Sequence, residues 1–285
     1  MKLRMFVDDI RIRVAGMNQA DTAKGGANVM NALLGHLQAS GCEVSEVKSV
    51  LMGSTATIRK ETQMRLSNAG RNLKVTTHAK DLGCDSTLGS TRRTKVMKTR
   101  LKKARSRAVV IAKLVKQNKR AQGMVRPSVA TTQAWGTGAM ITSSQTLRRF
   151  RANMLLAIGL KTKEVCHMTA ARLKWEPGAD PMRAEPLKMV SRWCATLAKN
   201  KKLEGQVAKA WTRKKLKDLV AKKKTWAAVT GPTTGVVKTL TELDWDMQSP
   251  TTWCYQGKQV QRGVDQNKEG LFEIVASSLE SKLWA

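Results

Sequence analysis

Apolar and polar positions alternate near the start of the chain. The alternating apolar positions are Leu3, Met5, Val7, Ile10, Ile12 and Val14. A period of two is typical of strands with one buried face. The pattern therefore predicts two short strands that are joined at Asp8 and Asp9.

After the first two strands, the apolar positions up to about residue 80 predict helices and further short strands. Asp21 is a candidate N-cap for a helix that ends near Gly41, with an apolar face made of Met30, Leu33, Leu34 and Leu37. Branched apolar residues in 43–52 predict another strand, a short helix is expected around 60–66, and a last strand around 73–77. We therefore expect a mixture of short strands and helices over the first ninety residues.

A helical period dominates the middle of the chain. Apolar residues recur at spacings of four and three, namely Met97, Leu101, Ala104, Ala108, Ile111 and Val115. This pattern predicts a long helix over 92–122, which Gly123 and Pro127 should end, and a second helix around 147–158. Four residues predict a turn-rich join before a basic helical layer over 190–220: Pro177, Gly178, Pro181 and Pro186.

The charge of the chain is the strongest indication of the kind of partner it binds. The 285 residues hold 52 Lys and Arg against 21 Asp and Glu, which gives a formal net charge of +31. Residues 86–163 contain no acid and 19 Lys and Arg. Helices that simply face solvent usually intersperse acids at i,i+4, so this uncompensated charge favours a nucleic-acid partner. A solvated helix face and a nuclear-import signal at 100–105 are the alternatives.

Other features narrow the class of protein. The five cysteines are scattered and contain no C-x-x-C pair, which argues against a disulfide framework or a zinc finger. The apolar runs are too short to span a bilayer, so we expect no membrane partner. Nothing at the start resembles a signal peptide. A nuclear or cytoplasmic location is expected.

The pair Asp8 and Asp9 is the main candidate for chemistry. Adjacent carboxylates in a tight turn form an oxygen-rich anionic corner that suits Mg²⁺. Nucleotidyl transfer uses two such ions about 4 Å apart. The alternative is that two acids simply favour a turn.

The order of these features resembles the palm of reverse transcriptases of the non-LTR retrotransposon type. The match starts at Phe6-Val7-Asp8-Asp9, where the family has an aromatic residue, a variable residue and two Asp, and continues through Val44–Ser49 to Lys80–Gly83. The resemblance implies that Asp8 ligates Mg²⁺, that Asp9 supports the site and that Lys48 lies near the leaving pyrophosphate. It also implies that Leu82 and Gly83 form part of the primer grip, and that a basic helical thumb follows.

The expected fold is an α+β remnant of a polymerase palm, with short antiparallel strands and helices, followed by a mainly α-helical basic region. Its expected segments are a partial palm at 1–90, a thumb-like or connecting region at 91–174, a basic helical region at 175–230 and a C-terminal region of unknown role at 231–285. Asp244 and Asp246, without further carboxylates, do not predict a ribonuclease H domain.

The expected function is that of a fragment of an RNA-directed DNA polymerase that binds RNA and DNA as a primer–template duplex. The family's other palm carboxylate and its fingers lie upstream of the hairpin, so we expect the isolated chain to be inactive. The alternative is a non-catalytic nucleic-acid-binding protein derived from a retroelement. The expected contacts to nucleic acid are Arg92, Arg93, Lys95, Lys98, Arg100, Lys102, Lys103, Arg105 and Arg107.

Overall fold

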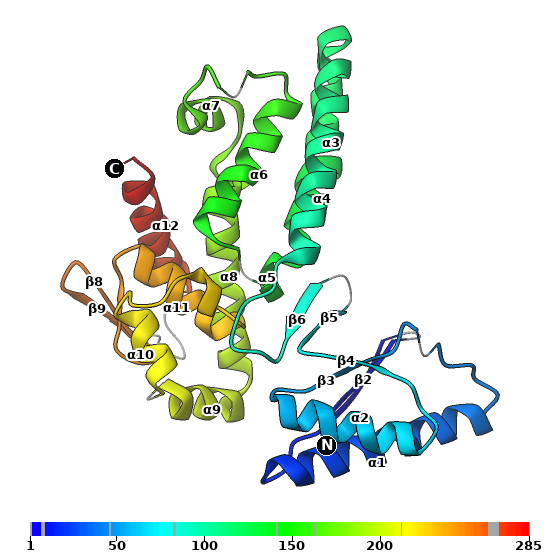
Figure 1. Cartoon of the computed structure of the whole chain (residues 1–285). Helices are drawn as coiled ribbons and strands as arrows, with labels where there is room; N and C mark the ends of the chain where they lie inside the picture. Colours follow the sequence, from blue (N-terminus) through cyan, green and yellow to red (C-terminus); the bar gives the residue numbers. More distant parts are fainter. Residues whose placement is uncertain are drawn as a thin grey trace. The chain divides into compact units, whose positions relative to one another are not determined.

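The computed structural model describes residues 2–6, 9–45, 47–81, 84–140, 142–161, 163–211, 213–261 and 268–284. Over these residues the chain is α+β, with long helices and short strands in small sheets (Figure 1). It divides into two compact units, the first formed by Met1–Ala79 with Ser86–Ser90 and the second by Lys80–Asp85 with Thr91–Ala285.

The first unit starts with the predicted pair of strands. β1 (Lys2–Phe6) and β2 (Asp9–Arg13) are antiparallel, and Phe6 lies opposite Asp9. The alternating apolar pattern therefore predicted both strands correctly.

Helix α1 (Gln19–Ala39) follows, and its N-cap differs from the prediction. The Asn18 side chain accepts a hydrogen bond of 2.8 Å from the backbone amide of Asp21. Asp21 thus lies in the first turn, where its charge complements the helix dipole, and its assignment as the N-cap was wrong. The predicted end is confirmed, because Gly41 has the left-handed φ of 75° common after a helix C-terminus.

A short β–α–β segment packs against α1. β3 (Val50–Met52) and β4 (Lys74–Thr76) are parallel and are connected through α2 (Ala56–Asn68). The buried core between these elements consists of Ala27, Leu34, Leu66 and Leu73. The strand predicted over 43–52 is confirmed only for its last three residues.

A second pair of strands follows the first unit's helices. β5 (His78–Asp81) pairs with β6 (Cys84–Thr87) in a two-stranded sheet. The residues between these strands, Leu82 and Gly83, lie outside the described part of the chain.

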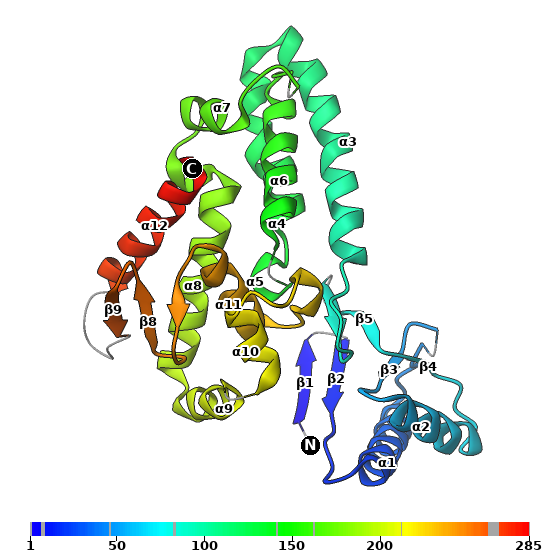
Figure 2. The ribbon, with the colours of Figure 1, turned by 60° about the vertical axis from the view of Figure 1, so that its left-hand side comes forward.

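Helices that run back and forth form the first half of the second unit (Figure 2). In chain order these elements are α3 (Lys95–Gln117), the 3₁₀ segment η1 (Lys119–Met124), the π-helical segment η2 (Val125–Ala130), α4 (Thr131–Ala134), α5 (Thr137–Met140), α6 (Ser144–Ala157), α7 (His167–Lys174), η3 (Pro177–Ala179) and α8 (Pro181–Lys199). Ala104, Ala108, Ile111, Met154 and Leu155 are buried between α3 and its neighbours.

Two helix ends differ from the predictions. α3 ends at Gln117 rather than near residue 122, and Pro127 lies within η2 instead of ending the long helix. The predicted join at 177–186 is helical, because Pro181 begins α8, where a missing N–H leaves no hydrogen bond unmade. Pro186 lies inside the same helix.

The second half of this unit surrounds a cluster of aromatic side chains. Its elements are α9 (Lys201–Trp211), α10 (Lys214–Val220), η4 (Trp226–Ala228), α11 (Pro232–Glu242), β7 (Asp246–Met247), β8 (Thr252–Tyr255), β9 (Lys258–Gln261) and α12 (Lys268–Trp284). The Trp193 and Trp253 ring centroids are 5.7 Å apart, and Trp245 stacks on Tyr255 at 5.0 Å. The segments expected at 91–174, 175–230 and 231–285 all belong to the second unit, and their separation into domains stays a prediction.

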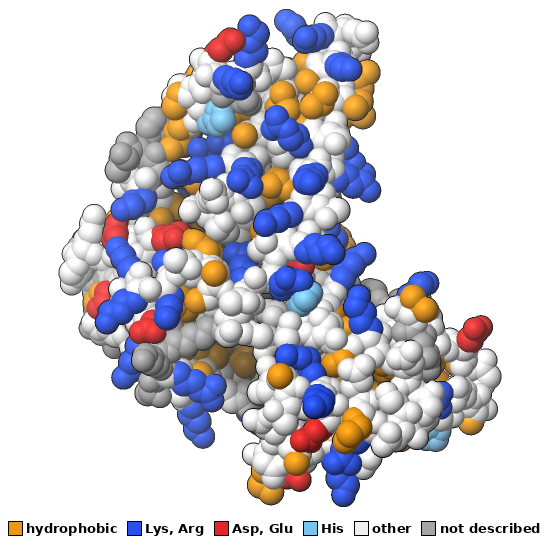
Figure 3. Space-filling model, viewed as in Figure 1, with side chains coloured by type: hydrophobic (Ala, Val, Ile, Leu, Met, Phe, Trp, Pro, Cys, Tyr) orange, Lys and Arg blue, Asp and Glu red, His pale blue; other side chains and the backbone are white. Residues whose placement is uncertain are grey.

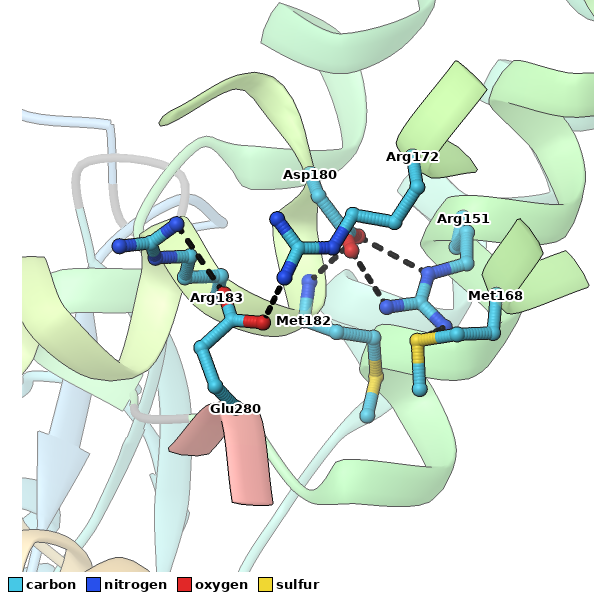
Figure 4. A network of polar contacts seen from close by, with 7 residues as sticks. All are labelled: Arg151, Met168, Arg172, Asp180, Met182, Arg183 and Glu280. Carbon is cyan, nitrogen blue, oxygen red and sulfur yellow. Dashed lines mark hydrogen bonds and ion pairs between the residues drawn. The ribbon is translucent and has the colours of Figure 1, made fainter. Parts of the chain in front are cut away.

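A buried ion pair joins α6 to the start of α8 (Figure 4). Arg151 Nε donates to Asp180 Oδ1 at 2.9 Å, and Arg151 Nη2 donates to Asp180 Oδ2. Asp180 Oδ1 also accepts from the Met182 amide at 3.1 Å and so caps α8. Nearby, Glu280 of α12 pairs with Arg172 and with Arg183. These contacts fix α6, α7, α8 and α12 to one another.

Candidate nucleic-acid interface

The basic helix α3 is capped by an acid from another element. Thr94 precedes the helix but makes no side-chain cap. Instead, the Asp85 carboxylate on β6 accepts hydrogen bonds from the Val96 amide at 3.0 and 3.1 Å and from the Met97 amide at 3.2 Å. A carboxylate at a helix N-terminus satisfies free N–H groups and complements the helix dipole. Asp85 thereby fixes where α3 begins.

One side of α3 packs into the core, as its sequence predicts. Met97, Ala104, Ala108, Ile111 and Val115 are all buried. Ala104 and Ala108 are fully buried and short, so α6 can lie close against α3 at these two positions. The buried side fixes which cations of the helix face outward.

Two arginines on one flank of α3 bind protein groups. Arg100 Nη1 donates to the Trp135 carbonyl oxygen at 3.0 Å, and its guanidinium carbon lies 5.6 Å from the centre of the Trp135 ring. Arg107 Nη1 donates to the Ser128 carbonyl oxygen at 3.4 Å and to Thr132 Oγ1. Both side chains help to attach η2 and α4 to α3.

Arg92, just before α3, also packs against protein. Its guanidinium carbon lies 5.6 Å from the centre of the Trp226 ring, and its backbone amide donates to the Ala227 carbonyl oxygen at 2.8 Å. Burial lowers the pKa of Arg92 to about 10, against the opposing effect of the nearby Asp85 charge. Arg92 remains a cation at neutral pH and joins the start of α3 to η4.

The remaining long flank of α3 forms what we call the cationic stripe. Its six residues are Lys95, Lys98, Lys102, Arg105, Lys113 and Lys116, and all are exposed. Their spacings of three, four, three, eight and three residues place them on one side of a helix. At 1.5 Å per residue the stripe is about 32 Å long, close to one turn of a nucleic-acid duplex.

The cationic stripe has no acidic partner in the part of the chain that the structure describes. No carboxylate among those residues lies within ion-pair distance of any cation on α3. In Figure 3, Lys and Arg side chains follow the length of α3. Exposed like charges repel one another, so a polyanion on this flank would relieve the repulsion.

The predicted metal site falls largely outside the described residues. Val7 and Asp8 are not described, and for Asp9 only the backbone at the start of β2 is described. Among the described residues, no group of three or more His, Cys, Asp and Glu could hold a metal ion. Two-metal chemistry needs more ligands than one pair of adjacent acids. Asp8 and Asp9 alone therefore do not fit a complete two-ion site.

The structure corrects the prediction for the surroundings of Lys48. Lys48 is exposed and lies in a turn, not on a strand. Both the amide and the hydroxyl of Ser49 donate to the Ser45 carbonyl oxygen, at 3.0 and 2.8 Å, which closes this turn. The neighbouring Val47 is 92% exposed, so the alternation of apolar residues here does not mark a buried strand face. The predicted primer-grip pair, Leu82 and Gly83, lies outside the described residues.

Sequence reasoning missed three residues of this candidate interface. Lys113 and Lys116 extend the cationic stripe, and the helical spacings of three, four and eight residues from Lys95 onward could have identified them. Asp85 acts from a different element, ten residues before the first residue of α3, and no local pattern indicates this contact. Of the predicted cations outside the stripe, Arg93 and Lys103 are also exposed.

No protein-family model, no curated protein and no solved structure matches this chain. None of the described helices has the length and the apolar composition needed to cross a bilayer.

Proposed function

We propose that this chain binds the sugar-phosphate backbone of a nucleic-acid duplex through the cationic stripe of α3. The observation behind this proposal is the row of six exposed cations on one helix flank, without a carboxylate partner among the described residues. Lys and Arg that neutralise phosphates release bound counterions, which gives affinity with little dependence on sequence. RNA and DNA duplexes both present this backbone.

We further propose that the chain is the C-terminal part of a retroelement reverse transcriptase and holds a primer–template duplex. The order of elements supports this proposal: an antiparallel pair β1–β2 around Asp8 and Asp9, helices with short strands, the β5–β6 pair around Leu82 and Gly83, and then a long basic helix. In this proposal Asp8 ligates metal, Asp9 supports it and α3 belongs to the thumb. The role of Lys48 near pyrophosphate rests on its place in this order alone.

We propose that the isolated chain does not catalyse polymerisation. Asp8 and Asp9 would supply only part of a two-ion site. The second candidate function is therefore a non-catalytic nucleic-acid-binding module derived from a retroelement. Both candidates bind a duplex, and they differ in whether Asp8 has a catalytic role.

Salt dependence tests duplex binding. Filter binding between about 50 and 200 mM salt should give log affinity against log salt a slope of about −5, since each neutralised phosphate contributes about −0.9. Two duplexes of unrelated sequence should bind alike. A flat line would exclude binding through phosphates.

Primer extension separates the two candidates. The chain would be joined to an upstream palm and fingers segment of a related element and compared with its Asp8→Ala variant. Loss of extension in the variant supports the polymerase origin, because Asp8 would then be required for metal binding. Extension that survives the substitution would count against it.

A further inference from the structure

A cavity of about 290 Å³ lies in the second unit, and none of the cationic-stripe residues lines it. Residues from α6, α8, α11 and α12 form its walls, and the apolar part consists of Leu147, Met182, Pro186, Leu243 and Leu279. Its volume is close to the lower end of the roughly 300–1,000 Å³ that is usual for small-molecule sites. The cavity therefore has room for one compact ligand.

A buried hydroxyl without a partner lines this cavity. The Thr142 residue is only 7% exposed, and its Oγ1 atom has no hydrogen-bond partner among the described residues. Nearly all buried polar side chains in proteins have such a partner, because an unpaired one destabilises the fold. A polar ligand in the cavity would supply the missing bond.

The side of the cavity formed by α6 favours an anion. Ser144, the first residue of this 14-residue helix, lines the cavity, so the positive end of the helix dipole lies beside it. Arg148 lines the cavity one turn further on and has no ion-pair partner among the described residues. Lys282 also lines it but donates to Asp244 Oδ2 at 2.7 Å, so Arg148 is the more available cation.

The part of the cavity wall formed by Trp226 and Glu242 favours a ligand with a planar aromatic ring that carries hydrogen-bond donors. Trp226 lines the cavity, and its Nε1 atom donates to Glu242 Oε1 at 2.7 Å, which fixes the indole. Indole rings stack on flat aromatic ligands. Glu242 itself lines the cavity, and an ionised carboxylate can accept several hydrogen bonds. The amino group of a nucleobase could donate to Glu242, whereas a simple aromatic carboxylate has no such donor.

We infer that this cavity binds a nucleotide. The phosphate lies at the start of α6 near Arg148, and the base lies against Trp226 with an amino group toward Glu242. The inference does not depend on duplex binding by the cationic stripe, because the two sites share no residue.

Calorimetric titration of the full chain with adenosine monophosphate, adenosine and inorganic phosphate tests the inference. Adenosine monophosphate should bind at least tenfold more tightly than either of the other two, since only it satisfies both parts of the wall. Arg148→Gln should weaken its binding about tenfold, because a charge-assisted contact to phosphate is lost. Arg149→Gln is the matched control, since Arg149 is exposed on the same helix and does not line the cavity.

A second variant, at Thr142, tests the role of the buried hydroxyl. Thr142→Val should raise the melting temperature of the free protein and weaken adenosine monophosphate about threefold or more. These opposite effects are not expected of a threonine with a purely structural role.

The outcomes also separate this inference from the proposed function. Adenosine monophosphate binding should persist when the cationic stripe is neutralised, and duplex binding should persist in Arg148→Gln. Equal binding of phosphate and adenosine monophosphate, or equal losses for Arg148→Gln and Arg149→Gln, would overturn the inference.

Discussion

Helix α3 and the C-terminal segment from α8 to α12 both carry Lys and Arg residues, but they differ in how the chain neutralises these cations. In the C-terminal helices, carboxylates lie next to several cations: Glu185 beside Lys188, Glu204 beside Lys201, Asp218 beside Lys224, Glu242 beside Lys238 and Asp244 beside Lys222 and Lys282. On α3, no cation has such a neighbour among the described residues. The number of cations is therefore a poorer guide to a binding surface than the absence of nearby acids.

Energetics support this distinction. Exposed ion pairs stabilise a fold by only about 0–1 kcal/mol, so an exposed pair on the C-terminal helices, such as Lys222 with Asp244, contributes little to stability. The main effect of such pairs is to weaken the positive field around those helices. Around α3 the field is not weakened, and it would attract phosphates from a distance that depends on salt.

The largest effect is expected where a cation of the acid-free stretch is buried. Arg151→Met leaves the Asp180 carboxylate buried without its partner, which should lower the free energy of unfolding by about 3–5 kcal/mol. Arg149→Met, on the exposed side of the same helix, should change it by less than about 0.5 kcal/mol. Denaturant unfolding of both variants checks the contrast, and similar losses would show that Arg151 contributes no more than a surface cation.

A second variant removes half of the cationic stripe. Lys98→Gln, Lys102→Gln and Arg105→Gln together should weaken duplex binding on the order of 10²-fold at about 0.1 M salt and reduce the magnitude of the salt slope by about 3. The matched control removes three cations that already have carboxylate neighbours, Lys188, Lys201 and Lys224.

Both triple variants lose the same net charge, so filter binding compares position at constant charge. The control should change affinity by less than about tenfold. If it loses as much affinity as the stripe variant, the overall charge of the chain, and not the stripe, determines binding.

A smaller effect is expected at the start of α3. Asp85→Ala removes the acceptor for the Val96 and Met97 amides and should destabilise the chain by about 1 kcal/mol. Asp85→Asn keeps an acceptor oxygen and should lose less. Thermal unfolding monitored by circular dichroism measures both, and equal stability of Asp85→Ala and the unmodified chain would contradict the capping role.

The sequence predicts elements better than it predicts contacts between them. The strands β1 and β2 and the buried side of α3 follow from periodicity alone, because periodicity reflects burial of the element itself. The cap of α3 could not be predicted, because Asp85 reaches it from a separate strand. Lys48 shows the opposite error, in which alternating valines looked like a strand although Val47 is exposed in a turn.

In the candidate nucleic-acid interface, too, local spacing predicts some features, whereas others depend on contacts between elements. The spacing of lysines predicts which cations share a flank of α3, whereas the partners of Arg100 and Arg107 depend on how η2 and α4 fold back. The cavity beside α6 combines residues more than a hundred positions apart, and no motif indicates it.

The smallest effect is expected at Asp244, where two lysines meet one exposed carboxylate. Hydrogen bonds from Lys222 and Lys282 lower the pKa of Asp244 from 3.8 to about 2. Because the folded state prefers the ionised carboxylate, its contribution to stability is complete above about pH 4 and is lost as the pH falls toward 2. Asp244→Asn should therefore melt slightly below the unmodified chain at pH 6 and together with it near pH 2.

The substitution at Asp244 suits the backbone as well as the charge. Asp244 has a left-handed φ of 64°, which Asn tolerates, so the difference in melting temperature reports the carboxylate rather than strain. Asp246→Asn is the control, since Asp246 is exposed and has no ion pair among the described residues. High salt should shrink the Asp244 difference at pH 6, because the group is about half exposed and its attraction to the lysines is screened. If the difference in melting temperature is equally large at pH 2 and pH 6, Asp244 stabilises the chain through its shape and not through its charge. The contrast between neutralised and uncompensated lysines would then have no electrostatic basis at this position.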